Sequence, residues 1–173
     1  MTKTRIIDNF LNKSYHQEIL NLLEGPNFPW YYQANITSNN KIKSFYNCGF
    51  NHILIDLNGP RLSNFYYLIL PFLLKIKDTL KVNKILRCRG DMTLNSSTRY
   101  THEYHTDFPY KNIATIYYVN ESDGDTIIKN SKEEKISPKS NRLIIFDGSV
   151  LHAGSSPKHH KNRILINSNF EKL

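Results

Sequence analysis

Apolar and polar residues alternate with a period of two through most of the chain from residue 84 onward. Successive side chains of a β-strand point to opposite faces, so this pattern predicts strands rather than helices. Turn residues, among them Asp123-Gly124-Asp125 and Gly148, separate the segments. The predicted strands are Ile85 to Leu94, Tyr100 to Asp107, Ile113 to Asn120, Thr126 to Lys129, Lys135-Ile136, Arg142 to Asp147 and Arg163 to Phe170.

Helical periodicity marks the N-terminal part instead. Ser14, with Gln17 three residues later, forms a capping box and predicts a helix of about ten residues that ends near Gly25. Ser63 is expected to cap a second, mostly apolar helix. Pro71 lies within that helix and is expected to kink or shorten it.

Two N-terminal segments are harder to assign. Ile6 to Leu11 predicts a first strand or a docking segment. Residues 26–62 are rich in aromatics such as Trp30 to Tyr32 and poorly periodic, which indicates either a lid or elements that the pattern conceals. Helices followed by strands predict a mainly β fold with flanking α, a sandwich or barrel backed by N-terminal helices. We expect one domain over residues 1–173, with helical support over about 1–83 and the β core over about 84–170.

The composition bears on whether the protein binds nucleic acid or membranes and on its cellular compartment. The net charge is +8, but the lysines are scattered and Asn, Ile and Tyr are also abundant, so nucleic acid is not an expected partner. Cys48 and Cys88 lie far apart without metal-like spacing and are expected to be free thiols in a cytoplasmic protein. The apolar run from Phe65 to Ile76 is shorter than the roughly 20 residues that cross a bilayer, so no membrane association is expected.

Two histidines and one aspartate have the character of a metal site. His105-Thr106-Asp107 is followed 45 residues later by His152 and 11 residues after that by Arg163. On a strand His105 and Asp107 would share a face, as two adjacent ligands of one metal require. Two imidazoles and a carboxylate bind Fe(II) on one side and leave the opposite positions open for a co-substrate and dioxygen. Arg163 would supply a planar fork of donors for a distant carboxylate.

Two other functions suit parts of this pattern. His, His and Asp with a water describe a zinc hydrolase as well, although Glu103 lies at the wrong spacing for an H-E-x-x-H motif and zinc gives no role to Arg163. A cupin-like barrel that binds a metal or ligand without turnover is the second alternative. By strand parity, His102 is expected to face away from His105, toward the surface.

Beyond these residues, the chain resembles the Fe(II)- and 2-oxoglutarate-dependent dioxygenases of the prolyl-4-hydroxylase-like branch. The resemblance covers residues 84–170 most strongly, and Asp8-Asn9-Phe10-Leu11 before a helix is similar to the start of such domains. The matching motifs are His105-Thr106-Asp107, Thr115 to Asn120, Asp123-Gly124-Asp125, Ser137 to Arg142 with Asn141 where glycine is common, and His152 to Arg163.

The resemblance implies a double-stranded β-helix, a jelly-roll or cupin-like barrel. It implies that His105, Asp107 and His152 bind iron, and that Arg163 and Tyr118 bind the C5 carboxylate of 2-oxoglutarate. Dioxygen is the other co-substrate and ascorbate a candidate reductant. The implied reaction hydroxylates a small-molecule or peptide substrate, with peptidyl or free proline as the specific candidate, and releases succinate and CO2.

Strand parity adds two candidate residues. Asn167 and Asn169 lie on the same side of their predicted strand as Arg163 and are expected to line the substrate cavity or the polar end of the barrel. Upstream, where some relatives have a second co-substrate tyrosine, this chain has Met92, Thr93 and Leu94, and no such role is assigned to them. The sequence does not indicate an oligomeric state.

Overall fold

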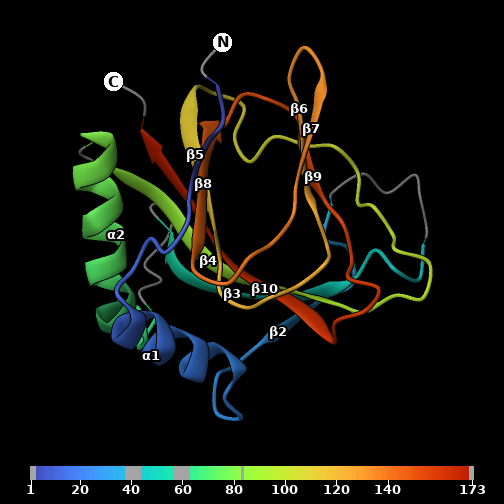
Figure 1. Ribbon diagram of the computed structural model, residues 1–173, viewed down its shortest axis with the longest axis horizontal. Coiled ribbons are helices and arrows are strands. Elements are labelled where there is room, and N and C mark those ends of the chain that lie inside the picture. Colours follow the sequence, from blue (N-terminus) through green and yellow to red (C-terminus); the bar gives the residue numbers. More distant parts are fainter. Residues whose placement is uncertain (1–2, 38–43, 57–62, 83, 172–173) are drawn as a thin grey trace.

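The computed structural model describes residues 3–37, 44–56, 63–82 and 84–171, which form two helices and ten strands (Figure 1). The helices are α1 (Lys13–Glu24) and α2 (Tyr66–Leu80). The strands are β1 (Arg5–Ile7), β2 (Tyr31–Gln33), β3 (Gly49–Asp56), β4 (Ile85–Leu94), β5 (Asn112–Tyr118), β6 (Thr126–Lys129), β7 (Glu133–Ile136), β8 (Arg142–Asp147), β9 (His152–Gly154) and β10 (Asn162–Glu171).

The strands form two antiparallel sheets. The larger has the order β1-β8-β5-β10-β4-β3-β2 and the smaller has the order β7-β6-β9. Isolated bridges from Thr101 to Ser155 and from His105 to His152 add the segment 101–105 beside β9. Sequence neighbours such as β4 and β5 are separated by β10, so the chain crosses between distant strands as a double-stranded β-helix does. The predicted mainly β jelly-roll with flanking helices is confirmed.

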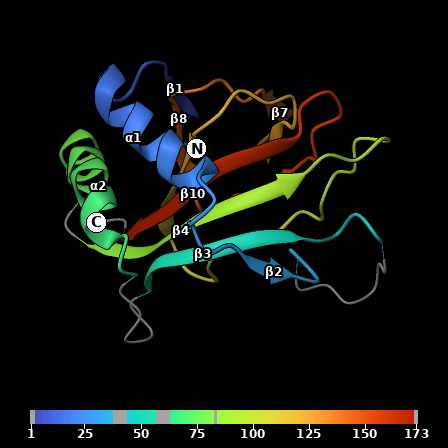
Figure 2. The same cartoon turned by 90° about the horizontal axis from the view of Figure 1, so that it is seen from below.

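The large sheet is buried on both faces, which explains why β5 and β8 are mostly apolar. Figure 2 shows α1 and α2 lying together on one side of the long strands β10, β4 and β3. Leu143 and Ile166 point to that side and pack in a cluster with helix residues such as Phe72. Their neighbours Ile144 and Leu165 point the other way, into a second cluster with Ile128 of the small sheet. Alternation along each strand therefore serves two cores.

The helix boundaries differ from those predicted. Asn12 caps α1, because its side chain accepts a hydrogen bond from the N–H of Tyr15, so the predicted Ser14 capping box is wrong. Gly25 ends α1 as expected. Ser63 lies before the N-cap of α2, where its Oγ accepts the N–H of Phe65 at 3.1 Å, and the N-cap is Phe65 itself. Both differences are shifts of about two residues, the usual uncertainty of helix ends.

Pro71 lies inside α2 without ending it, so the predicted shortening is wrong. The Tyr15 hydroxyl enters the helix beside it: it donates to the carbonyl of Leu68 at 2.6 Å and accepts from the N–H of Phe72 at 3.1 Å. Leu68 and Phe72 are the partners of one helical hydrogen bond, four residues apart. The hydroxyl is therefore inserted into the helical hydrogen bond next to the proline and satisfies both of its backbone groups.

One prediction about the extended segments is wrong, and two that left alternatives open are decided. Residues Tyr100 to Asp107 are not a strand; only the two isolated bridges attach them to β9. The segment 26–62 contains β2 and β3, which the pattern concealed because their aromatic and polar residues do not alternate; residues 38–43 and 57–62 of it lie outside the described residues. The segment Ile6 to Leu11, expected to be a first strand or a docking segment, contains both: β1 ends at Ile7, and Leu11 then donates its N–H to the Asn141 side chain.

Asn141 has a positive φ of 62°, a left-handed conformation that asparagine adopts more readily than most residues. Its side chain also donates to the Leu11 carbonyl and accepts from the Tyr117 hydroxyl. A glycine would allow the same turn but would lose these bonds to the N-terminal segment.

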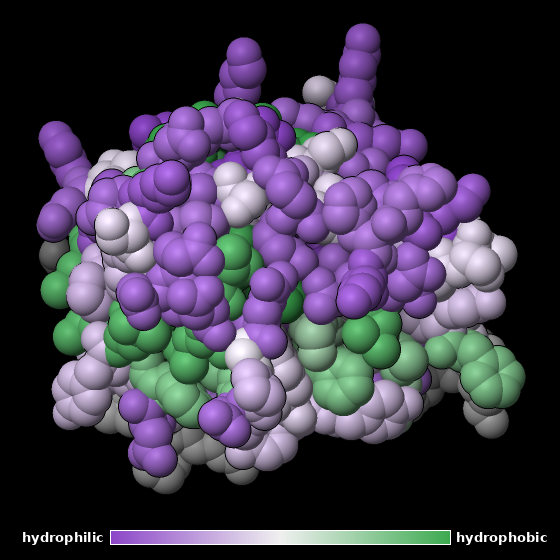
Figure 3. All heavy atoms as spheres, turned by 60° about the horizontal axis from the view of Figure 1, so that its bottom comes forward, coloured by the Kyte–Doolittle hydropathy of each residue, from purple (hydrophilic) through white to green (hydrophobic). Residues whose placement is uncertain are grey.

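None of the helices in the described part of the chain combines the length and the apolar character that crossing a membrane requires; the longer one, α2, has 15 residues. On the face shown in Figure 3, hydrophilic residues cover the upper part and hydrophobic residues gather in a band below.

We expect Tyr15→Phe to lower the free energy of unfolding by about 1–3 kcal/mol, because a buried helical donor and acceptor lose their shared partner. Urea denaturation followed by circular dichroism measures the change. Tyr67→Phe, on the exposed side of α2, is the matched control and should change stability by less than about 0.5 kcal/mol. Equal effects of the two variants would contradict a bridging role for the Tyr15 hydroxyl.

Candidate metal centre

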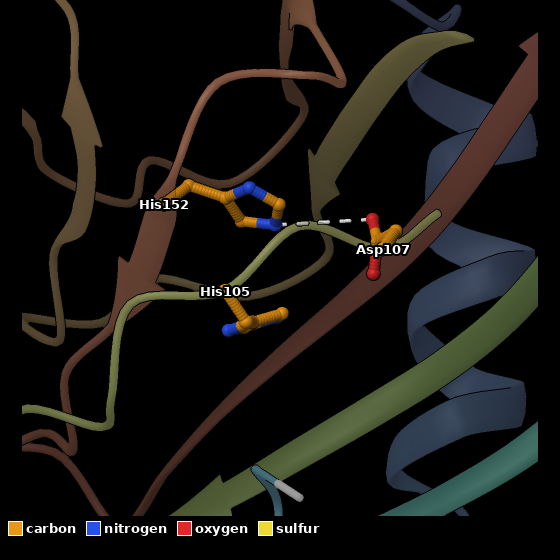
Figure 4. Close-up of side chains that lie close together, drawn as sticks. All are labelled: His105, Asp107 and His152. Atoms are coloured by element: carbon orange, nitrogen blue, oxygen red, sulfur yellow. Dashed lines mark ion pairs between the residues drawn. The ribbon is translucent and has the colours of Figure 1, made fainter. Parts of the chain in front are cut away.

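His105, Asp107 and His152 meet at one point between the sheets. One ligand atom from each lies within 4.8 Å of the others. Figure 4 shows the imidazole of His152, at the start of β9, directed toward the carboxylate of Asp107, with His105 on the same segment as Asp107. The Nε2 atom of His152 lies 3.8 Å from Oδ2 of Asp107.

A backbone bridge brings the two histidines together. The N–H of His105 donates to the carbonyl of His152 at 3.0 Å, and the N–H of His152 donates to the carbonyl of His105 at 2.9 Å. Pairing between two chain segments, rather than a continuous strand through His105 and Asp107, therefore sets the spacing. The proximity that strand parity predicted is present, but its predicted cause is not.

Each imidazole presents an unprotonated nitrogen. Nδ1 of His105 lies 3.1 Å from the carbonyl oxygen of Glu103, and Nδ1 of His152 lies 3.2 Å from that of Val150. A carbonyl only accepts, so Nδ1 carries the proton and Nε2 keeps a lone pair. Nε2 of His152 is buried without a hydrogen-bond partner among the described residues. Burial also lowers the pKa of His152, despite the opposing effect of Asp107, which favours the neutral ligand form.

Asp107 is held as a buried carboxylate. Arg87 donates to its Oδ1 at 2.5 Å, while Asn167 and Asn169 donate to its Oδ2 at 3.3 and 3.0 Å. Burial acts to raise the pKa of Asp107, but the guanidinium groups of Arg87 and Arg89 outweigh it and hold that pKa well below its ordinary value. The carboxylate is therefore ionised and oriented from two strands, β4 and β10.

A cavity of about 180 Å³ extends from this cluster. Its lining includes His105, His152 and Arg163 of β10. Arg163 lies four residues before Asn167, which contacts Asp107, so about 13 Å of strand separates the arginine from the metal cluster and places it at the other end of the cavity. Arg163 is 5% exposed, and among the described residues no carboxylate pairs with it. A buried cation without a counter-ion is costly, so this end of the cavity suits an anionic ligand.

Thr126 and Tyr118 complete the environment of Arg163. Nη2 of Arg163 and the Tyr118 hydroxyl both donate to Oγ1 of Thr126, each at 2.6 Å, so the threonine can turn its own proton toward a ligand. Tyr118 is fully buried, and burial raises its pKa. Gly154 lies beside the guanidinium: a Cβ there would be 3.2 Å from Nη1 of Arg163, so a side chain would crowd it.

Asn167 and Asn169 lie on the cavity side of β10, as parity predicted, and both contact Asp107. Asn167 also lines the cavity, while the fully buried Asn169 donates to Asn112 as well.

Several polar residues of the cavity were not predicted from the sequence. His102 is 4% exposed and lines the cavity, so its predicted surface position is wrong. Burial lowers its pKa to about 4, with a further contribution from Arg163. Arg87, Arg89 and Asp91 of β4 face the same interior; the regular alternation of Arg87-Cys88-Arg89-Gly90-Asp91 was the signal that could have found them.

The arrangement has a definite chemical capacity. Two neutral imidazoles and one carboxylate can bind a divalent transition metal from one side, which leaves the cavity side for further ligands. The donors at Arg163 lie at the far end of the same cavity and suit a second anionic group of a bound molecule. The donor set and the orphaned His152 nitrogen thus fit a ferrous centre with a chelating oxo-acid.

Solved structures share this fold. An oxidoreductase of the 2OG-Fe(II) oxygenase family from Burkholderia pseudomallei is 13% identical, with a TM-score of 0.75 over 97% of this chain and 84% of that chain. A prolyl hydroxylase from Trichoplax adhaerens, solved with a peptide fragment of hypoxia inducible factor, is 16% identical, with a TM-score of 0.70 over 96% and 82% of the two chains. A viral collagen prolyl hydroxylase from Paramecium Bursaria Chlorella virus-1 is 15% identical, with a TM-score of 0.62 over 99% and 97%.

Comparison with curated protein sequences finds no match. The family described as the 2OG-Fe(II) oxygenase superfamily matches residues 92–171, the span from β4 through β10 that carries the metal cluster and Arg163. With this match, and with the fold that it shares with prolyl hydroxylases, the chain is an iron- and 2-oxoglutarate-dependent dioxygenase.

Proposed function

We propose that this dioxygenase binds Fe(II) through His105, Asp107 and His152 and the C5 carboxylate of 2-oxoglutarate through Arg163, with help from Tyr118. The observation that carries the proposal is the convergence of three ligand atoms within 4.8 Å at one end of a cavity that has a buried, unpaired arginine at the other. When bound, iron with 2-oxoglutarate and dioxygen supplies the oxidation that turns a C–H bond into C–OH, with release of succinate and CO2.

The residues around the cluster have supporting roles in this proposal. Arg87, Asn167 and Asn169 hold the Asp107 carboxylate in one orientation, as outer partners of metal ligands commonly do. The carbonyls of Glu103 and Val150 fix the imidazole tautomers. The apolar side chains of Ile116 and Leu165 line the cavity between its two ends and limit the access of water.

The substrate is a small molecule or a peptide, and we propose a proline, free or peptidyl, as the group hydroxylated. Support comes from neighbours of the same fold that are prolyl hydroxylases, one of them solved with a peptide fragment. We also propose a cytoplasmic location, in keeping with free thiols at Cys48 and Cys88.

The metal ligands are tested with the apo-protein under argon. Adding Fe(II) and 2-oxoglutarate should produce the visible charge-transfer band of the chelate, and His152→Ala should lose it because one of three protein ligands is missing. His159→Ala, at an exposed histidine, should keep the band. Bound iron without a band in the wild type would refute the 2-oxoglutarate function and return attention to a zinc hydrolase or a binding barrel.

Arg163→Ala should distinguish binding of 2-oxoglutarate from binding of iron. We expect iron binding to persist while the affinity for 2-oxoglutarate falls by about 10-fold or more, because a charge-assisted contact to the C5 carboxylate is lost. Titration of the band with 2-oxoglutarate measures this, with the exposed Arg5→Ala as control. Loss of iron with retained 2-oxoglutarate binding would show that Arg163 is assigned wrongly.

Asn169→Ala should weaken Fe(II) binding by about 10-fold, the lower end of the effect of outer partners of metal ligands, because Asp107 loses a donor that orients it. Competition with a chromogenic chelator gives the dissociation constant. Asn21→Ala, on the exposed side of α1, should leave it unchanged. An unaltered affinity in Asn169→Ala would leave the orientation of Asp107 to Arg87 and Asn167.

A further inference from the structure

The inner face of β4 is charged where the core of a sandwich is normally apolar. Side chains of this strand alternate between the two faces of the large sheet. Cys88 is buried in the cluster on the helix side of the sheet, while Arg87, Arg89 and Asp91 face the other side. Arg87 is occupied by Asp107, which it contacts at 2.5 Å. Arg89 acts on Asp107 only through its charge, and neither Arg89 nor Asp91 makes a hydrogen bond to a metal ligand among the described residues.

Arg89 and Asp91 form an ion pair in the wall of the cavity. Nε of Arg89 donates to Oδ2 of Asp91 at 2.9 Å, and both side chains are largely buried, with 22% and 23% exposed. Within the part of the chain that the structure describes, no other hydrogen bond involves the Nη1 and Nη2 atoms of Arg89 or Oδ1 of Asp91. The pair therefore keeps donors and an acceptor available to a molecule in the cavity.

The strand register places this pair close to the metal cluster. Arg89 is opposite Asn167 of β10, whose amide donates to Asp107, and Asp91 is opposite Leu165 in the next row. Directly opposed residues of antiparallel strands are about 4.5–5.5 Å apart between Cα atoms. Asn51 of β3 is opposite Asp91 on the outer side and lines the cavity too, next to Gln33. The pair thus lies between the metal end and a rim of neutral polar side chains.

Removing an ion pair from water costs free energy that hydrophobic residues in the same place would not. A ligand recovers this cost only if it offers a negative group to Arg89 and a positive group to Asp91. Because the two side chains touch, these groups must also be neighbours on the ligand. The α-carboxylate and α-ammonium of a free amino acid are separated by a single carbon and meet this requirement.

We propose that Arg89 and Asp91 form the recognition site for a free α-amino acid substrate, Arg89 binding its carboxylate and Asp91 its ammonium group. The proposal rests on the proposed function, since it places the side chain of that amino acid toward the metal centre. An internal residue of a peptide carries neither charge, and it would leave the pair desolvated without compensation.

Calorimetry on protein loaded with Mn(II) and 2-oxoglutarate under argon tests the proposal, with the standard L-amino acids, free proline among them, as probes. We expect at least one to bind. Its N-acetyl and carboxamide derivatives should bind at least about 10-fold more weakly, because each lacks one of the two charges. The proposal is overturned if no free amino acid binds, or if a capped derivative such as N-acetyl-proline amide binds as well as the free form.

Variants then identify the site. Arg89→Gln and Asp91→Asn should each weaken binding of the amino acid by about 10-fold or more, because each variant loses one charged contact with the ligand. Arg142→Gln and Asp8→Asn alter a comparable ion pair outside the cavity and should have no effect. Amino acid binding that survives both cavity variants would refute the assignment of Arg89 and Asp91.

The charge-transfer band of the wild type distinguishes failure of the proposed amino acid site from failure of the proposed oxygenase function. A band without amino acid binding would leave the oxygenase site standing and would exclude a free amino acid as substrate. Absence of the band would instead refute the proposed function, on which this inference depends.

Discussion

The backbone bridge between His105 and His152 is the contact on which the candidate site depends. Two hydrogen bonds join a segment that otherwise lacks regular structure to the short strand β9. This pairing brings one histidine next to the other, and it carries Asp107, two residues further on, to the large sheet. Without it, the polar side chains of β4 and β10 would face a cavity with no ligand set at its end.

The position of the cavity follows from how the interior between the two sheets changes along its length. At one end Ile144, Phe146 and Ile128 pack as an ordinary apolar core. Toward β4 and β3, polar and charged side chains replace them, and the sheets enclose space instead of side chains. Apolar packing therefore holds the sheets together and keeps the polar end open.

The two ends of the cavity differ in charge. Arg163 lies at one end without a carboxylate partner among the described residues, while Asp107 lies near the other between Arg87 and two asparagine amides. The excess of positive charge in this interior suits a metal centre whose co-substrate is a dianion, since both charged ends of that molecule meet donors. The guanidinium groups of Arg87 and Arg89 hold the pKa of Asp107 low and keep it available as an anionic ligand.

The pattern along the chain is enough to predict the metal-binding chemistry and the class of fold. The period-two pattern identified β4, β5, β6, β8 and β10, because their burial depends on local alternation, and the His105, Asp107 and His152 motif has a fixed order along the chain. Which side chains share the cavity depends instead on contacts between segments that are distant in sequence. A continuous strand from Tyr100 to Asp107 would turn His102 to the surface. His102 is buried instead, because that segment pairs with β9 only through isolated bridges. The position of Arg89 and Asp91 beside the metal cluster is fixed by the pairing of β4 with β10, and that register depends on contacts distant in sequence.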